Sequence, residues 1–236
     1  MTSFALPSDY ARVRAVGSFD ELVATPLAGG VNALGWPRVL AGDFAEVVAA
    51  LGPAEGVVAL DATRLRALPV GAAGRLAVDA MLADLQRLRE RDLDPVLNVI
   101  GGYPRDEEPG PVATDVFSFH ADSAPVEADT WLCTYFGPPS ELLRHEEARR
   151  RVDVPETRAA LREIFGGGEG AEFEAFLQEH CYDLHYAPAA GARPISFGVG
   201  NLWRIACDWP GSPVPPCIHR APATQPGDRP RLLLIS

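Results

Sequence analysis

Two histidines and one aspartate are the residues whose types and spacing could perform chemistry in this chain. His120 and Asp122 lie two residues apart after a strand-like run at residues 116–119, so on a β-strand their side chains would point to the same side. His219 follows a second short extended stretch, residues 214–218. Two imidazoles and one carboxylate can hold Fe(II) on one face and leave the opposite face open to other molecules. The pattern therefore predicts a metal site formed by His120, Asp122 and His219.

Two arginines follow the distal histidine. Arg229 and Arg231 lie ten and twelve residues after His219, and an apolar run at residues 232–235 comes next. An H-x-D pair, a distal histidine and a basic residue about one strand later resemble the 2-oxoglutarate/Fe(II)-dependent oxygenase superfamily, over residues 94–236. The order of these residues carries the resemblance, because H-x-D alone is a common chance match.

The resemblance implies Fe(II) as the metal and 2-oxoglutarate as the co-substrate. His120, Asp122 and His219 would then be both the iron ligands and the catalytic centre, and one arginine would bind the far carboxylate of 2-oxoglutarate. Arg231 is favoured because, by strand alternation, it shares a face with apolar residues of the last strand. Arg229 lies between an aspartate and a proline, a sequence more typical of a turn.

A looser likeness is to uncharacterised bacterial proteins of the DUF1826-like group, which share an H-x-D and a downstream T-Y-x-G-P run. That run stands at residues 134–138 here, and the likeness names no reaction. The chain departs from the oxygenase pattern in two ways. It has no clear R-x-S ending, and a long segment with helical composition separates His120 from His219.

Three further residues are candidates for contact with 2-oxoglutarate. Asn98 lies in a strand-like run at residues 95–100 and Tyr103 follows it; in one oxygenase branch an asparagine and a tyrosine in the comparable place touch the co-substrate. Tyr135 lies, with its neighbour Thr134, in the apolar run after H-x-D, where the family often has a residue that hydrogen-bonds to the co-substrate. Each has a structural alternative. Asn98 would satisfy a turn, Tyr103 would be a surface aromatic, and Tyr135 would pack in the core.

Three other residues are candidates for a substrate pocket. Asp183 and His185 form a second strand-like pair of ligand types, so His185 also competes for the metal. Trp203 and Arg204 lie in a strand-like run, residues 202–206, that we expect to form a hairpin with residues 195–199. The alternatives are core packing for His185 and Trp203, and a surface salt bridge for Arg204.

The flanking segments predict an α+β fold. Helices are expected at residues 43–51 and 72–91, and the second has a leucine and methionine stripe from Leu76 to Leu88, with charges such as Asp84 facing elsewhere. Residues 1–40 are expected to be irregular, apart from one extended segment near residues 30–37. Ser140 is a plausible cap and Pro155 a plausible first residue for helices in the segment 140–180.

The resemblance implies a double-stranded β-helix (jelly roll) core over residues 94–236. Residues 1–93 would pack on it as a mixed helical segment, and residues 140–180 would be a helical insert able to form a lid over substrate. We expect these parts to make one structural domain, because a β-barrel-type fold of 236 residues is commonly one.

Composition excludes several classes of protein. A net charge of −11 argues against non-specific nucleic-acid binding, and no apolar run is long enough to span a membrane. All 21 basic residues are arginines, which excludes lysine-based catalysis and suits bidentate binding of a carboxylate. Four cysteines without C-x-x-C spacing, and an N-terminus without a signal-peptide pattern, favour a cytoplasmic protein with reduced thiols.

We therefore predict an Fe(II)/2-oxoglutarate-dependent oxygenase that hydroxylates a small molecule or an amino-acid or peptide substrate. A non-haem iron enzyme that does not use 2-oxoglutarate is a variant of this prediction. A non-catalytic jelly-roll protein that binds a ligand or a structural metal is the alternative from another class. A zinc hydrolase is a further alternative, because the same ligands can hold zinc. The sequence identifies neither the substrate nor the oligomeric state.

Overall fold

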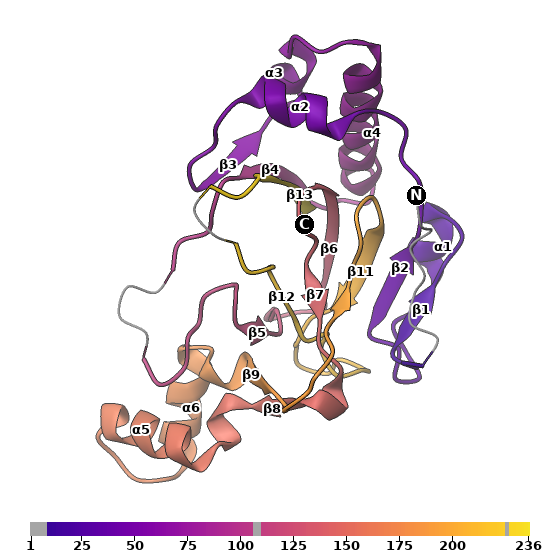
Figure 1. The fold of residues 1–236 in the computed structure, drawn as a ribbon. Coiled ribbons are helices and arrows are strands. Elements are labelled where there is room, and N and C mark those ends of the chain that lie inside the picture. The colour runs from indigo at the N-terminus through magenta and orange to yellow at the C-terminus, as the bar shows by residue number, and fades with distance from the viewer. Residues whose placement is uncertain (1–8, 106–109, 225–226) are drawn as a thin grey trace.

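Two β-sheets lie at the centre of the computed structural model of this chain, which describes residues 9–105, 110–224 and 227–236. Six α-helices accompany the sheets in the described part of the chain, so the fold is mixed α+β (Figure 1). Residues 1–8 of the predicted N-terminal segment and residues 106–109 of the loop before H-x-D lie outside the described residues.

The larger sheet has seven strands in the order β1-β2-β11-β6-β13-β4-β3. Its longest strand, β6, alternates between its two faces and is buried over most of its length, because both faces are covered. The last strand, β13, runs antiparallel between β4 and β6 and is therefore central. The strands are β1 (Val13–Ala15), β2 (Ala33–Trp36), β3 (Val57–Leu60), β4 (Val96–Ile100), β6 (Asp129–Phe136), β11 (Leu202–Ala206) and β13 (Arg231–Ile235).

The smaller sheet has six strands in the order β10-β7-β12-β5-β9-β8. Its strands are only two to four residues long, and every pairing in it is antiparallel. The sheet lies beside the concave face of the larger one (Figure 1). The strands are β5 (Phe119–His120), β7 (Glu141–Leu142), β8 (Ala148–Arg150), β9 (His185–Pro188), β10 (Ile195–Ser196) and β12 (His219–Arg220).

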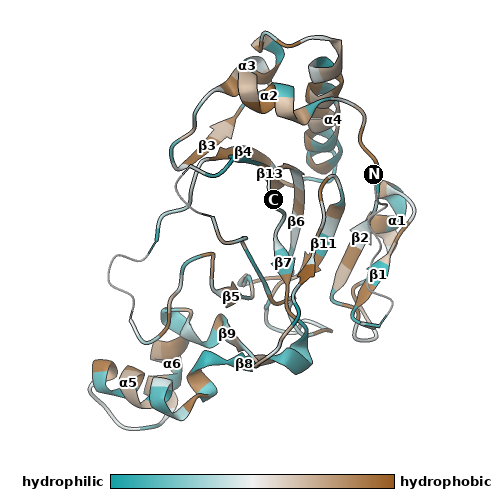
Figure 2. Cartoon of the chain, viewed as in Figure 1, coloured by the Kyte–Doolittle hydropathy of each residue, from teal (hydrophilic) through white to brown (hydrophobic). Residues whose placement is uncertain are grey.

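The helices form two groups at opposite ends of the molecule (Figure 1). The group α2 (Phe44–Leu51), α3 (Ala62–Ala67) and α4 (Ala72–Arg89) shares a core with the outer face of the larger sheet. The group α5 (Pro155–Phe165) and α6 (Ala171–Glu179) packs around its own apolar cluster near β8 and β9. A sixth helix, α1 (Phe19–Ala24), lies beside β2, and α4 carries both hydrophobic and hydrophilic residues (Figure 2).

The predicted helix starts and ends are confirmed where capping residues define them. Asp43 caps α2 by accepting hydrogen bonds from the backbone N–H groups of Ala45 and Glu46, at 2.9 and 3.0 Å. Gly52 ends that helix with a positive φ of 77°. Pro155 opens α5, where its missing N–H group breaks no intrahelical hydrogen bond.

The stripe predicted for α4 is partly wrong. Met81, Leu85 and Leu88 are buried, but Leu76 is exposed. Asp84, expected to face away from the core, is fully buried because it hydrogen-bonds to Arg38 and Tyr135 across the interface with the sheet. A charged residue at helical spacing can thus face the core when a partner from another segment reaches it.

Three predictions about the connecting segments are also wrong. Residues 13–24 form β1 and α1, not an irregular stretch. The segment 140–180 is α-helical only from Pro155, because β7 and β8 come first and pair within the smaller sheet, with two short 3₁₀ turns (His145–Glu147 and Arg151–Asp153) beside β8. The expected hairpin at residues 195–206 does not form, since β10 pairs with β7 in one sheet and β11 with β6 in the other. The turn at Gly200 carries the chain between the sheets.

Candidate metal centre and the cavity between the sheets

The three predicted metal ligands converge at one point of the smaller sheet. His120 on β5 and His219 on β12 are directly opposite each other in the antiparallel pair, and their ring centroids are 4.6 Å apart. The Asp122 Oδ1 atom lies 3.7 Å from His120 Nε2, and its Oδ2 atom lies 3.6 Å from His219 Nε2. All three ligand atoms lie within 4.8 Å of one another, so one ion could contact all of them.

The route by which Asp122 reaches this point differs from the prediction. Strand β5 ends at His120, so the two residues do not share a strand. Backbone hydrogen bonds hold the following residues instead. Ala121 N–H donates to the Leu184 carbonyl at 3.0 Å, and Asp208 N–H donates to the Asp122 carbonyl at 2.7 Å. These bonds fix the backbone of Asp122 although it lies beyond the end of the strand.

Backbone carbonyls set the orientation of both imidazole rings. His120 Nδ1 lies 2.8 Å from the Ser118 carbonyl oxygen, and His219 Nδ1 lies 3.2 Å from the Cys217 carbonyl oxygen. Because a carbonyl oxygen only accepts, each Nδ1 must carry the proton and donate it. Each Nε2 then keeps a lone pair that faces the other ligands, which is the tautomer a metal ligand requires.

The charge states of His120 and Asp122 also suit a divalent cation. Burial lowers the pKa of His120, and the neighbouring His219 lowers it further, so the ring is neutral at neutral pH. Burial alone would raise the pKa of Asp122, but His219, the Thr130 hydroxyl and His120 together bring it below its usual value. The site therefore offers neutral imidazole nitrogen and ionised carboxylate, the donor set of a divalent transition-metal site.

Thr130, which the sequence analysis did not single out, holds the carboxylate from the other sheet. Its hydroxyl donates to Asp122 Oδ2 at 2.5 Å and lies 3.3 Å from the thiol of Cys207. Thr130 belongs to β6 of the larger sheet, whereas Asp122 follows β5 of the smaller one. The hydrogen bond therefore fixes the third ligand between the two sheets.

A cavity of about 250 Å³ opens beside the three ligands and lies between the two sheets. The larger sheet contributes mainly aliphatic side chains to its wall, and the smaller sheet contributes the two histidines. Asn98 and Tyr103 also line it, as the prediction of a binding role requires. The described lining residues are Val57, Asn98, Ile100, Tyr103, Val116, His120, Asp122, Thr130, Leu132, Ser140, His219, Ala221, Leu233 and Ile235.

Arg231 lies directly behind two of the lining residues. It is the first residue of β13, is 1% exposed, and donates to the hydroxyls of Tyr103 and Ser140, each at 3.0 Å. A third hydroxyl, that of Thr134, lies 3.4 Å from its Nη2 atom. Ser140, expected to cap a helix, is thus a buried partner of this arginine. Arg229, the other candidate, is exposed in the loop before β13.

The guanidinium of Arg231 has no carboxylate within ion-pair distance among the described residues. Its buried Nε atom also has no hydrogen-bond partner there. Burial lowers the pKa of Arg231, and Tyr103 opposes this effect. A buried cation that has only hydroxyl partners is energetically unfavourable, and an anionic ligand that reached it would remove much of this cost.

Tyr135 is placed away from the cavity, so the structure gives no support to its predicted contact with 2-oxoglutarate. Successive residues of a strand point to opposite faces, and Tyr135 points toward α4, where its hydroxyl donates to Asp84 Oδ2 at 2.8 Å. Its ring stacks on Phe44 of α2. The alternative interpretation of Tyr135 as a core residue describes this environment, and its neighbour Thr134 contacts Arg231 instead.

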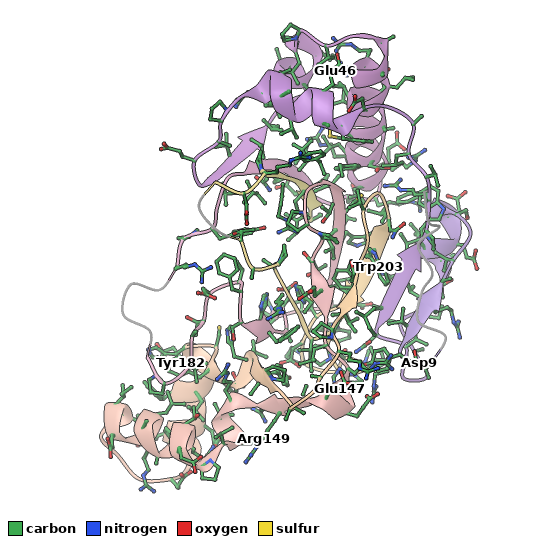
Figure 3. All side chains as sticks on the ribbon, in the orientation of Figure 1. Asp9, Glu46, Glu147, Arg149, Tyr182 and Trp203 are labelled. Carbon is green, nitrogen blue, oxygen red and sulfur yellow. The ribbon has the colours of Figure 1, made fainter. Side chains whose placement is uncertain are left out.

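The three predicted pocket residues lie outside the cavity wall. His185 on β9 pairs with His120, with ring centroids 5.7 Å apart, but is not part of the three-ligand cluster. Trp203 is buried in the core on β11, where its indole N–H donates to the Phe197 carbonyl at 2.7 Å (Figure 3). Arg204 points to the opposite face and forms an ion pair with Asp129 at 2.6 Å.

The alternative D-x-H ligand pair does not form. Asp183 lies in a 3₁₀ turn (Tyr182–Leu184), and its carboxylate is 3.8 Å from Arg150. The sequence analysis missed Thr130 and the contact of Ser140 with Arg231. Threonine and serine are common in strands and turns, so only the alternation of side chains along β6 would have placed Thr130 on the same face as Leu132 and Thr134.

Comparisons with protein-family models, with curated proteins and with solved structures find no match for this chain. Helices that could cross a membrane were also sought, and in the described part of the chain none combines the necessary length with sufficient apolar character.

Proposed function

We propose that this protein is an Fe(II)/2-oxoglutarate-dependent oxygenase that acts on a small molecule. One observation carries the proposal. His120, Asp122 and His219 converge beside a cavity, and a buried arginine without a carboxylate partner in the described chain lies behind the same cavity. A metal site explains the first feature, and a dicarboxylate co-substrate explains the second.

The order of the strands supports a jelly-roll core, the fold proposed for such an enzyme. Four neighbouring strands can be taken from each sheet: β4-β13-β6-β11 from the larger one and β5-β12-β7-β10 from the smaller one. The chain passes from one set to the other between β4 and β5, β5 and β6, β6 and β7, β10 and β11, β11 and β12, and β12 and β13. Eight strands divided in this way between two facing antiparallel sheets are typical of a jelly roll.

In this proposal His120, Asp122 and His219 would hold the metal. Their donor set fits Fe(II), because both Nε2 atoms are available as acceptors and the carboxylate is ionised. Arg231 would bind the carboxylate of 2-oxoglutarate that lies farther from the metal, and its buried Nε atom without a partner fits this role. When bound, Fe(II) with 2-oxoglutarate supplies the oxidising chemistry.

The chain itself supplies position and exclusion of water. Ser118 and Cys217 hold the imidazole tautomers through their carbonyl groups, and Thr130 orients the carboxylate. Tyr103 and Ser140 hold the guanidinium of Arg231 in one place. The aliphatic wall contributed by the larger sheet limits the water that can share the cavity with a substrate.

An anaerobic titration tests the proposal. Apo-protein is titrated with Fe(II) and then with 2-oxoglutarate, and the visible charge-transfer band of the chelate is followed. We expect the band in the wild type and its loss in His219→Ala. Arg231→Met should weaken 2-oxoglutarate binding by about 100-fold or more, since a charge-assisted bidentate contact is lost. Arg229→Met is the matched control, because Arg229 is exposed, and it should bind normally.

Each other outcome excludes part of the proposal. If Fe(II) binds and no band forms, the 2-oxoglutarate role is wrong and an iron enzyme of another type remains. If Zn(II) binds much more tightly than the Irving–Williams order explains and Fe(II) binding is weak, a zinc site is favoured. If no metal binds to the wild type, the histidines are structural and the alternative of a ligand-binding protein replaces the enzyme.

A further inference from the structure

Half of the side chains that line the cavity are aliphatic, and apart from the three candidate metal ligands the others are the neutral polar residues Asn98, Tyr103, Thr130 and Ser140. Seven aliphatic side chains line it, and Asp122 is the only carboxylate among the described lining residues. No arginine lines it directly, because Arg231 lies behind Tyr103 and Ser140. The aliphatic residues are Val57, Ile100, Val116, Leu132, Ala221, Leu233 and Ile235.

Three of these side chains also form the opening of the cavity. Val57 is 47% exposed, Ile235 is 39% exposed and Val116 is 36% exposed, although all three line the same cavity. They come from β3, β13 and the turn before β5, so three separate segments place apolar side chains at one opening. A neighbouring hollow shares Val57, Val116 and Tyr103 with the cavity. A molecule approaching the metal ligands through this hollow therefore passes over aliphatic surface.

Most polar groups inside the cavity already have partners. Thr130 donates to Asp122, and Tyr103 and Ser140 accept from Arg231. Asn98 differs, because its side-chain amide makes no hydrogen bond to any described residue although it is largely buried. The cavity thus offers a ligand the neutral amide of Asn98 and the hydroxyl hydrogens of Tyr103 and Ser140, and its described lining carries no charged group apart from the candidate metal ligands.

From this lining we propose that the substrate presents an uncharged aliphatic or aromatic group to the metal. The inference rests on the proposed function and names its substrate class. When 2-oxoglutarate occupies Arg231, a charged ammonium or phosphate group of a substrate would lose its hydration in the rest of the cavity, where the remaining wall is aliphatic or neutral and polar. The charged groups of free amino acids and nucleotides should therefore stay outside the cavity, and the predicted amino-acid or peptide substrate is restricted to one that reacts at an apolar side chain.

Size restricts the substrate as well. A cavity of about 250 Å³ is smaller than the ~300 to 1,000 Å³ typical of sites for drug-sized ligands, so only a small group fits beside a co-substrate. Any charged part of the substrate must remain in the outer hollow. Arg105 and Asp115 line that hollow, but the Asp115 carboxylate accepts from the backbone N–H groups of Phe117 and Ser118.

Binding of small probes to the metal-free full chain tests this inference without depending on iron. Saturation-transfer difference NMR would compare cyclohexanol, a neutral apolar probe, with L-alanine and with glucose. Saturable binding is expected for cyclohexanol alone. Val57→Asp and Val116→Asp should each weaken it by about tenfold, because a carboxylate at the opening replaces apolar contact. Val39→Asp is the control, since Val39 is highly exposed and does not line the cavity.

The outcomes separate this inference from the proposed function. Two results would contradict the proposed substrate class. The first is that Val57→Asp and Val39→Asp bind cyclohexanol equally well. The second is that L-alanine or glucose binds saturably and that Val57→Asp weakens this binding. Neither result would affect the charge-transfer band, so the proposed function would remain supported by the titration. Conversely, if cyclohexanol binds selectively but no charge-transfer band forms, an apolar ligand is supported and the proposed oxygenase function is contradicted. Thermal melting of each variant identifies any substitution that unfolds the protein, and the two rim variants then serve as replacements for each other.

Discussion

Two buried arginines lie on opposite faces of the larger sheet, and their surroundings differ. On the face toward α4, Arg38 donates to both carboxylate oxygens of Asp84, to the Gly200 carbonyl at 2.7 Å and toward the thiol of Cys133. On the face toward the cavity, Arg231 has only hydroxyl partners among the described residues. Strand β6 separates them, because its alternate residues face the two sides.

The pKa values of the two arginines follow this difference. Burial alone would lower the pKa of Arg38, but Asp84 raises it above its usual value. Burial lowers the pKa of Arg231, and no carboxylate among the described residues compensates. On the face toward α4, the buried charge of Arg38 is paired with that of Asp84. On the face toward the cavity, Arg231 has no carboxylate partner among the described residues, so the partner of its charge must come from elsewhere. We therefore expect substitutions on the first face to change stability and those on the second to change binding.

The largest expected effect comes from making the same substitution on both faces. Arg38→Met should lower the free energy of unfolding by about 3 to 5 kcal/mol, because it leaves Asp84 buried with reduced compensation. Arg231→Met should change it by less than about 1 kcal/mol or increase it, since removing a buried cation without a carboxylate partner relieves a cost. Urea unfolding of the metal-free proteins measures both. Similar losses in the two variants would show that Arg231 has a structural partner.

Tyr135 offers a smaller test on the closed face. Tyr135→Phe should lower the free energy of unfolding by about 1.5 to 3 kcal/mol, because the lost hydrogen bond is made to a buried carboxylate. Binding of Fe(II) and 2-oxoglutarate should be unchanged. Tyr182→Phe is the control, because Tyr182 has no side-chain hydrogen bond within the described chain. A change in 2-oxoglutarate affinity on Tyr135→Phe would instead revive its predicted role at the co-substrate.

Two threonines of β6 provide a matched pair on the open face. Thr130→Val should weaken Fe(II) binding by about 10- to 100-fold, because the hydroxyl that orients Asp122 is lost. Thr134→Val removes a hydroxyl near Arg231 and should leave Fe(II) affinity intact. Anaerobic titration with Fe(II) alone measures both. Equal Fe(II) affinities in the two variants would show that the Thr130 hydroxyl does not contribute to metal binding.

The smallest expected effect is that of Arg87, the second arginine near Asp84. Its side chain is 42% exposed, although its Nη1 atom lies 2.8 Å from Asp84 Oδ1. Solvent screens such a pair, so Arg87→Ala should lower the free energy of unfolding by about 0.2 to 1 kcal/mol. Urea unfolding beside Arg38→Met provides the comparison. A loss as large as that of Arg38→Met would mean that the two arginines share Asp84 equally.

Sequence-based prediction succeeded for elements defined by interactions between residues close in the chain, and it failed where the interacting residues are far apart in the chain. Local signals were sufficient for α2, whose cap Asp43 and terminal Gly52 are adjacent to the helix. The three candidate metal ligands could be grouped from residue type and order, although Asp122 reaches the site through backbone contacts with Asp208 that no pattern encodes. Without the family resemblance, periodicity alone would not have joined His120 to His219.

The failures involve partners that are distant in the chain. Asp84 was expected at the surface because helical periodicity does not reveal Arg38. Residues 195–206 have a composition typical of a hairpin, but their two halves pair with strands of different sheets. β10 pairs with β7 in the smaller sheet, and β11 pairs with β6 in the larger one. Thr130 carries no motif at all. Its role depends on the packing of one sheet against the other, which local sequence does not report.

The central position of β13 has a consequence for the order of folding. Residues 231–235 come after β4 and β6 in the chain, yet they pair with both strands and complete the middle of the larger sheet. Until they emerge, those two strands have unpaired edges facing each other, which exposes them to aggregation. Arg231 arrives with the same strand. The end of the cavity next to Arg231 and the continuous sheet therefore form in the same step, and shortening β13 would divide the sheet rather than trim its edge.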